Sequence, residues 1–325
     1  MRERRWGLRS RMDRKFFNVF MLGLAFMLLF TAFQTSSIIE KTVLESIRAE
    51  DPSFTADGYV SLAIIYAAFS VANWIAPSVI SVVSPKWTMV IGASPYVVFI
   101  GSFLRPTTWL VYLMSALLGI GAALLWTGQG TYLTMNSDED NMVRDSGIFW
   151  AMMQTSLLFG NLLVFFEFEG QKTIGLETRT TVFSALLAVA ILGYLVFCVL
   201  RSYQPNRPGN TSSDDPEVLH TAGAVSSQIV RGPKEALVAS AKLFVTMDMA
   251  LLSVTFLYSG VEMSFFSGVY SAAIGFTDQL GADAARYIGI SGMLIGAGEI
   301  TEIYYMGQHL VEAVPVCVTA CRNVN

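Results

Sequence analysis

Charge is scarce in this sequence. Only 14% of its 325 residues are charged, against about 25% in a typical soluble domain. A soluble surface needs charged and polar side chains to cover it, whereas 53% of these residues are hydrophobic. The composition therefore excludes an ordinary soluble domain and predicts an integral membrane protein with the lipid bilayer as its first partner.

Cysteine and histidine are also scarce. The cysteines, Cys198, Cys317 and Cys321, are too scattered for a disulfide framework. The histidines, His220 and His309, lie outside the long apolar runs, and no Ser-His-Asp, Cys-His or paired-carboxylate arrangement is visible. The spacing of His309, Cys317 and Cys321 fits no standard zinc site. We therefore expect no catalytic residue, no enzymatic activity, no metal, no cofactor and no nucleic-acid partner.

Long uncharged runs are what the sequence does contain. Trp109–Leu133 and Ser146–Phe166 flank a short polar segment, Asn136 to Asp145. Each run exceeds the roughly 18–20 apolar residues that a helix needs to cross a bilayer, so the pair predicts a membrane hairpin. The same pattern predicts further spans at Phe16–Ile39, Gly58–Val83, Trp87–Leu104, Thr180–Leu200 and Met249–Phe276, with a partial span from Tyr287.

The predicted fold class is an all-α multi-pass membrane protein with a six-span N-terminal half and an incomplete second half. From Arg201 the composition turns polar and rich in Pro, Gly, Ser and Asp, which is typical of a flexible linker. The predicted organisation is a basic tail at 1–15, six spans at 16–200, a linker at 201–242, one full and one partial span at 243–300, and a divergent tail at 301–325.

Lysine and arginine predict the orientation of these spans. One side of the predicted membrane carries the basic tail, Lys86, Arg144 and five basic residues of the linker. The other side carries Lys41, Arg48, Arg105, Lys172, Arg179 and Arg286. The positive-inside rule then predicts a cytoplasmic N-terminus, without distinguishing the plasma membrane from an internal one. The linker sequon at Asn210 would be cytoplasmic and is expected to stay unglycosylated.

Glu262 is the one ionisable residue deep inside an otherwise complete predicted span. A carboxylate in a membrane is costly and is a functional candidate by default. Tyr258 and Ser259 precede it by four and three residues and share its helix face. One hypothesis is a proton- or partner-binding site, and the more conservative one is a carboxyl group that serves helix packing.

Uncharged polar residues form a second candidate site. Gln154 and Asn161 are seven residues apart, so they lie on nearly one helix face, with Trp150 at one end. Asn73 and Gln129 are weaker cases of the same kind. These residues are candidates for a polar solute path, although polar side chains also hydrogen-bond between membrane helices, and the packing interpretation is favoured.

Several motifs resemble the Unc-93-like branch of the major facilitator superfamily. They are F-T-A-F-Q-T from Phe30, A-I-I-Y from Ala63, I-A-P-S-V from Ile75, G-I-G-A-A-L-L-W-T-G-Q-G from Gly119, N-S-D-E from Asn136, S-G-I-F-W-A from Ser146, F-F-S-G-V-Y from Phe265 and I-S-G-M-L-I-G-A-G-E-I from Ile290. The resemblance runs from about Phe16 to Ile300, and the residues that follow predict a truncated second half.

The resemblance implies one of two functions. Major-facilitator proteins place a solute site between two six-span halves, which implies a transporter of an unknown small solute, inactive in a truncated form. The Unc-93-like branch is also associated with ion-channel regulation and receptor trafficking, which implies a non-transporting adaptor for another membrane protein. The short turn Ser84-Pro85-Lys86-Trp87 lacks the basic Gly-Asp-Arg-rich loop of ordinary transporters, which favours the adaptor.

Overall fold

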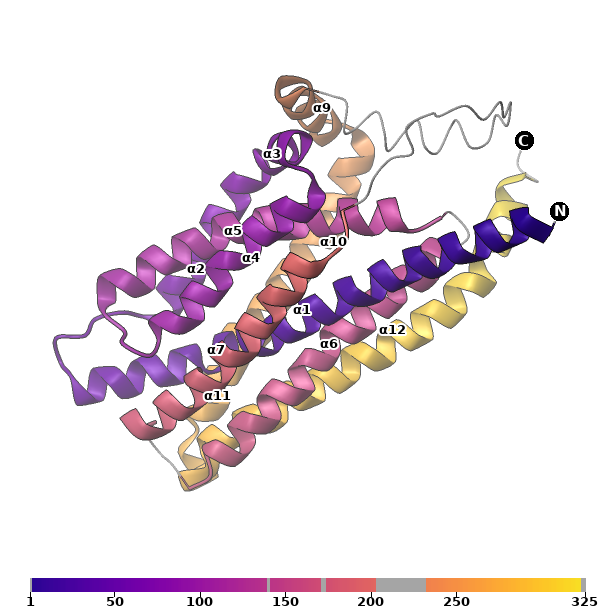
Figure 1. The fold of residues 1–325 in the computed structure, drawn as a ribbon. Coiled ribbons are helices and arrows are strands. Elements are labelled where there is room, and N and C mark those ends of the chain that lie inside the picture. Colours follow the sequence, from indigo (N-terminus) through magenta and orange to yellow (C-terminus); the bar gives the residue numbers. More distant parts are fainter. Residues whose placement is uncertain (1, 139–140, 171–173, 203–231, 323–325) are drawn as a thin grey trace.

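The computed structural model describes residues 2–138, 141–170, 174–202 and 232–322. Side chains are described from Arg14 to Tyr305, except in those gaps and at Ser267, Ala282 and Tyr304. All regular structure in the described ranges is helical (Figure 1). The elements are α1 (Arg2–Glu50), α2 (Gly58–Asn73), α3 (Ala76–Val83), α4 (Pro85–Ser102), α5 (Thr108–Asn136), α6 (Met142–Glu167), α7 (Leu176–Val199), α9 (Pro233–Phe244), α10 (Met247–Ser264), the π-helix η2 (Phe265–Tyr270), α11 (Ser271–Gly275), the 3-10 helix η3 (Asp278–Asp283) and α12 (Ala284–Arg322).

Five helical segments among the described residues are long and apolar enough to cross a membrane. They are Arg14–Glu50, Thr108–Asn136, Met142–Glu167, Leu176–Val199 and Met247–Gly275, and the bent pair of α2 and α3 makes a sixth if it counts as one span. The predicted all-α multi-pass class is therefore confirmed. Helix α4, predicted as a span, is not among the five because Pro85, Lys86 and Pro95 lower its hydropathy.

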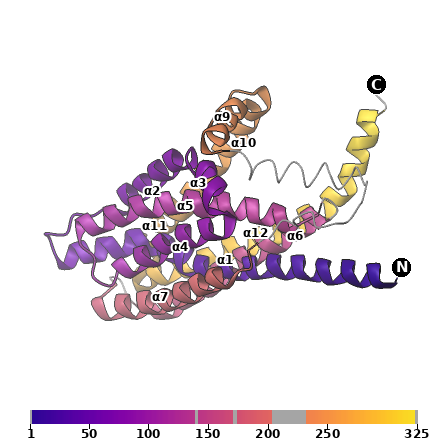
Figure 2. The same ribbon diagram turned by 45° about the horizontal axis from the view of Figure 1, so that its top comes forward.

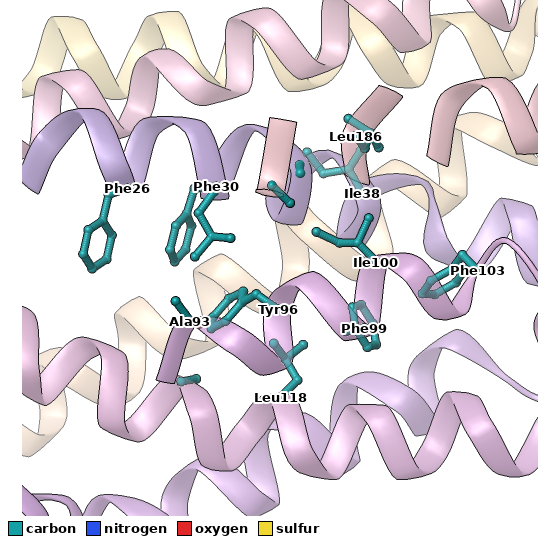
Figure 3. Packing of buried hydrophobic residues seen from close by; sticks show 14 of the residues in the cluster. Phe26, Phe30, Ile38, Ala93, Tyr96, Phe99, Ile100, Phe103, Leu118 and Leu186 are labelled. Carbon is teal, nitrogen blue, oxygen red and sulfur yellow. The ribbon is translucent and has the colours of Figure 1, made fainter. Parts of the chain in front are cut away.

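Helix α1 runs through the middle of the first seven helices (Figures 1 and 2). Its Phe26 ring lies 5.3 Å from Trp126 of α5, 5.0 Å from Phe149 of α6 and 5.3 Å from Phe197 of α7, measured between ring centroids. One turn later Phe30 reaches Tyr96 of α4, at 5.6 Å (Figure 3). Such tilted and edge-to-face pairs add specific contacts to the apolar packing, so this cluster of rings fixes four helices around α1.

Helix α1 is longer than its predicted span. The predicted span ends at Ile39, but the helix continues to Glu50. Ile39, Val43 and Ile47 are buried and repeat at a helical spacing of four residues, so one apolar stripe carries the helix onward between polar neighbours. Polar residues of this stretch are buried as well, since Glu40, Thr42 and Ser46 are each at most 6% exposed.

A break between α2 and α3 bends the second span by 60°. Pro77 lies in the first turn of α3, where the missing N–H of proline costs nothing. Helix α9 packs on α3, and Ser78 Oγ donates a 2.9 Å hydrogen bond to the Pro233 carbonyl oxygen. The predicted linker therefore ends earlier than expected, because residues 233–242 are already helical.

The segments after the linker pack on the first half through α12 and α11. Helix α12 lies along α6, whereas α10 stands apart until the chain reaches η2 and α11, which contact α1 (Figures 1 and 2). Ser271 and Ala272 of α11 are buried, while α10 has no buried residue. The contact between α6 and α12 is therefore the principal joint between helices before and after the linker.

Candidate functional site

Three glycines of α12 form its contact with α6. A Cβ atom on Gly289 would lie 2.6 Å from the Asn161 carbonyl oxygen, and one on Gly296 would lie 2.7 Å from Leu157 Cβ. A Cβ on Gly292 would collide with the Asn161 side chain. Small residues at this spacing let two membrane helices approach closely, so the glycines explain the close approach of α6 and α12.

The predicted polar residues Gln154 and Asn161 are buried in this joint. Asn161 is fully buried, and its Nδ2 donates a 2.8 Å hydrogen bond to the Leu157 carbonyl oxygen. Asn161 Oδ1 and Gln154 Oε1 are buried without a hydrogen-bond partner. These two side chains thus occupy a tight interface, and each keeps one acceptor unpaired there.

A second polar contact lies between α1 and α6. Ser156 Oγ donates to Gln34 Oε1 at 2.5 Å, and Thr35 packs against Gly160 so closely that a Cβ there would collide with Thr35 Oγ1. Thr35 Oγ1 is also buried without a partner. Neither Gln34 nor Thr35 was predicted as a site residue because both fall near the end of the predicted span, although two polar residues beside a phenylalanine-rich run are a visible signal.

The other residues predicted for a polar path lie elsewhere. Trp150 is 39% exposed and stacks on Trp126 with ring centroids 5.7 Å apart, at the edge of the aromatic cluster. Gln129 is buried on α5. Asn73 lies at the end of α2 and lines, with Trp74 and Phe244, a cavity of about 200 Å³ beside α9. The structure therefore brings together only Gln154 and Asn161 of the five.

Glu262 lies on the exposed surface of α10, as do Tyr258 and Ser259. Among the described residues, Glu262 interacts electrostatically with Glu299 of α12. Glu299 also interacts with Glu302. Glu299 Oε2 is buried without a hydrogen-bond partner. The chain thus gathers carboxyl groups near Glu262, whose own side chain is exposed whereas that of Glu299 is half-buried.

Glu40 of α1 is a buried carboxyl group that the sequence pattern did not indicate. Only 3% of its surface is exposed, and Oε1 has no hydrogen-bond partner. It borders a cavity of about 10 Å³, shared with Ser37, Gly58 and Gly268. The predicted span ends one residue before Glu40, which leaves this residue outside it. Its position one helical turn after Ser36 and Ser37 was the available signal.

An ion-pair network lies beside Glu40 at the start of α2. Lys41 Nζ lies 2.8 Å from Glu45 Oε1 and 2.5 Å from Asp57 Oδ2, and Arg48 Nη1 lies 3.1 Å from Glu45 Oε1. Asp57 also caps α2, since its carboxylate accepts hydrogen bonds from the backbone of Tyr59 and Val60. Partial burial would raise the pKa of Asp57, but the hydrogen bonds from Lys41 and the backbone outweigh it and lower that pKa.

Arg286 joins the beginning of α12 to the end of α6. Its Nη1 lies 2.9 Å from Glu169 Oε1, and its guanidinium stacks 4.0 Å from the centroid of the Phe165 ring. Nearby, the backbone N–H of Gly170 donates to Asp283 Oδ1 at 3.1 Å. These contacts close the end of the α6–α12 joint opposite to Gln154.

Some predicted positions lie outside the described part of the chain. Asn210 and His220 fall in the undescribed range 203–231, and the side chains of His309, Cys317 and Cys321 are not described. Among the residues that are described, no group of three His, Cys, Asp or Glu side chains is arranged to hold a metal ion.

Sequence comparisons relate the chain to known proteins. A family model described as "Ion channel regulatory protein UNC-93" matches residues 53–309. The UNC93-like protein MFSD11 of Xenopus laevis is 42% identical over 289 residues, covering 89% of this chain and 64% of the relative. Its counterpart from Xenopus tropicalis is 40% identical over 293 residues, with the same coverage.

More distant similarities extend the comparison. Protein unc-93 homolog A of Homo sapiens is 28% identical over 313 residues. Among solved structures, the peptide transporter POT in complex with alafosfalin is 16% identical, with a TM-score of 0.42 over 78% of this chain and 51% of that one. The chain spans 64% of the length of the two Xenopus relatives.

Proposed function

Because the chain belongs to the UNC-93 family, we propose that it acts in the transport of a small solute across a membrane, by opening and closing the joint between α6 and α12. The observation that carries this proposal is the pair of unpaired acceptors in that joint, Gln154 Oε1 and Asn161 Oδ1. The proposed activity needs no enzymatic chemistry and no cofactor.

The unpaired acceptors make the closed joint easy to open. Leaving a buried polar atom without a hydrogen bond costs about 1–3 kcal/mol, so two such atoms offset part of the packing energy that the glycines supply. When the joint opens, water or a polar solute donates to both acceptors. A bistable joint of this kind is what alternating access between two groups of helices requires.

The chemistry of the joint limits the solute. Gln154 and Asn161 are uncharged, and their free atoms are acceptors. A solute bound here would donate hydrogen bonds, as hydroxyl, amide or ammonium groups do. We therefore propose a small polar solute with donor groups, recognised without a charged side chain on α6.

Accessibility of the joint tests the opening without knowledge of the solute. We expect Asn161→Cys, in a variant whose native cysteines are replaced by serine, to react slowly with a water-soluble maleimide in reconstituted vesicles. Leu186→Cys, which is 1% exposed in the packed core of the first half, is the buried control. Equal protection of both positions would contradict opening of the joint.

Solute flux is the second test. Leu157→Cys and Gly296→Cys place two thiols across the joint. A Cβ on Gly296 would lie 2.7 Å from Leu157 Cβ, so α12 must move out by about 1 Å to reach the roughly 3.5–4.5 Å separation of a disulfide. For any neutral or cationic polar solute that the reconstituted protein takes up, oxidation of this pair is expected to stop uptake and reduction to restore it. Uptake that continues through the cross-linked joint would overturn the proposed mechanism.

A regulatory function is the second candidate, and α10 favours it. This helix of 18 residues has no buried residue in the described structure, and most of its exposed residues are apolar. An apolar helix surface of this kind suits contact with another membrane protein, in keeping with the family's description as an ion channel regulatory protein. Flux by the purified chain alone would exclude a purely regulatory role.

A further inference from the structure

Glu40 of α1 lies in a chain of hydroxyl groups that leads from α1 to α5. Its carboxyl group lies close enough to the Ser61 side chain of α2 to interact with it. Ser61 Oγ lies 2.8 Å from Ser115 Oγ of α5, and Ser115 Oγ donates at 2.7 Å to the Val111 carbonyl oxygen. Both serines are fully buried, so no solvent takes part in these contacts.

Counting hydrogens along this chain assigns a proton to Glu40. A hydroxyl group has one hydrogen to donate. Ser115 donates its hydrogen to Val111, because a carbonyl oxygen can only accept. Ser61 must then donate to Ser115 and has no hydrogen left for Glu40. All three contacts are hydrogen bonds only if the carboxyl group of Glu40 is protonated and donates to Ser61.

The charges around Glu40 give the same answer independently. Lys41 Nζ is engaged by Glu45 and Asp57, and Arg48 is engaged by Glu45, so two cations balance two anions. An ionised Glu40 would be an additional negative charge, 3% exposed and close enough to Asp57 to be repelled by it. A buried charge without a partner costs several kcal/mol, whereas a neutral acid avoids that cost.

The small cavity beside Glu40 links it to the helices after the linker. Its wall includes Ser37 of α1, Gly58 of α2 and Gly268 of η2. A volume of about 10 Å³ is at the lower limit for one water molecule, so a proton carrier fits while a larger ligand does not. A Cβ on Gly268 would lie 3.1 Å from a terminal methyl of Leu62, so η2 closes tightly over this site.

We propose that Glu40 is a proton-binding site, and that release of its proton loosens the contact of α1 with α2 and η2. The titratable and charged groups that face it are Lys41 of α1, and Asp57 and Tyr59 at the start of α2. Helix α5 contributes Ser115 through Ser61 and Tyr112, whose hydroxyl accepts a hydrogen bond from the Asp57 backbone N–H, and η2 contributes Gly268. The site goes beyond the proposed transport and does not depend on it.

Infrared spectroscopy of the purified full chain in detergent tests the proton directly. At neutral pH we expect a C=O stretching band of a protonated carboxyl group that exchanges slowly with deuterium. Glu40→Gln should abolish this band, and Glu45→Gln, which changes an ion-paired carboxylate on the same helix, should leave it in place. A band that persists unchanged in Glu40→Gln would overturn the assignment.

Two further measurements cover a variant that fails to fold. Ser61→Ala keeps Glu40 but removes its acceptor, so the band should shift to higher frequency rather than vanish; an unshifted band would overturn the hydrogen-bonded acid. The apparent melting temperature of the unmodified chain should fall as alkaline pH removes the proton, and Glu40→Gln should lack that fall. Identical pH profiles for the two proteins would overturn the loosening.

Discussion

Asp57 shows how one side chain serves two purposes. Its carboxylate caps α2 through the backbone N–H groups of Tyr59 and Val60, and it pairs with Lys41 of α1. Asparagine can replace the cap but cannot replace the charge. The two roles can therefore be separated by comparing Asp57→Asn with Asp57→Ala.

The charge of Asp57 predicts a pH-dependent stability. Its pKa is lower in the folded protein than the value of about 3.9 expected for an unfolded chain. Its stabilising contribution is therefore complete above about pH 4 and is lost as pH falls through the folded pKa. In thermal unfolding we expect Asp57→Asn to be less stable than the unmodified chain at neutral pH, by about 1 kcal/mol or less.

Acidification supplies the control for this prediction. The gap between Asp57→Asn and the unmodified chain should close at acidic pH, because both side chains are then neutral. Asp57→Ala should remain about 1 kcal/mol less stable than Asp57→Asn at every pH, since it loses the cap. A gap that is independent of pH would show that the Lys41–Asp57 pair contributes nothing.

Arg286 predicts a difference between two positively charged residues. Arg286→Lys can keep the ion pair with Glu169 but loses the flat guanidinium that stacks on Phe165. We expect it to lower the free energy of unfolding by about 0.5–1 kcal/mol, the usual range for such a contact at a partly exposed site. Phe165→Leu should remove the same contribution, so the double variant should cost no more than either change; additive losses would contradict the stacking.

For single residues, the sequence predicts which side chains share a helix face better than it predicts which elements pack against that face. The seven-residue spacing of Gln154 and Asn161 predicts a shared helix face, and both are buried in one interface. Whether that face meets a cavity or a helix depends on α12, more than 100 residues away, and periodicity within one helix carries no such information. Glu40 was missed for a related reason, because its burial depends on α2 and η2 covering it.

Among the elements, α12 is held on α6 by the absence of side chains at three positions. Gly289, Gly292 and Gly296 face α6, whereas Gly298 faces open space with nothing within 4 Å of its Cβ position. Alanine at these positions therefore tests the joint with the same chemical change in different surroundings.

The alanine series predicts a graded result. Gly289→Ala meets the backbone of Asn161 and Phe165, which cannot move aside, so we expect a loss of about 1–3 kcal/mol in thermal unfolding. Gly292→Ala meets the Asn161 side chain instead, so Asn161→Ala should restore much of its loss. Gly298→Ala should stabilise the protein by up to about 1 kcal/mol through helix propensity.

Failure of the rescue would contradict the packing described for this joint. The same holds if Gly298→Ala is as harmful as Gly289→Ala, because the joint would then not distinguish the faces of α12. Asn161→Ala alone should be nearly neutral, since the side chain's acceptor atom, Oδ1, is buried and unpaired.

The positions of helices could be predicted where hydropathy alone determines them. The runs that became α5, α6 and α7 were located to within a few residues at most ends, because a long uncharged stretch has few alternatives in a membrane protein. The continuation of α1 to Glu50 and the start of α9 at Pro233 were not predicted. Both are mixed polar and apolar segments, in which packing partners rather than composition decide helix formation.

For the whole molecule, family membership confirms the resemblance that the motifs indicate, and the helices confirm the all-α multi-pass class. The chain spans 64% of the length of its Xenopus relatives, so transport and regulation are both proposals for this chain. The orientation of the chain in the membrane is predicted from the sequence alone. Labelling experiments can test it.

Labelling of single cysteines tests the predicted cytoplasmic N-terminus. Ser202 follows α7 and Ser53 follows α1, so the two exposed positions lie at opposite ends of the bundle. In a cysteine-free background, after intact cells are blocked and then selectively permeabilised, we expect an impermeant maleimide to label Ser202→Cys and not Ser53→Cys. The reverse pattern would contradict the positive-inside prediction.

The π-helix η2 has a consequence for how this sequence can change over evolutionary time. The π-helix spans Phe265–Tyr270. Its wider turns arise when a helix accommodates one additional residue while the helical segments on either side keep the same faces toward their neighbours. Here the flanks are the uncovered α10 and α11, of which Ser271 and Ala272 are buried. A relative that lacks a single residue in this segment would keep both flanks in place and run through as an ordinary α-helix. A one-residue gap in an alignment at this point would therefore mark a preserved architecture rather than a damaged one.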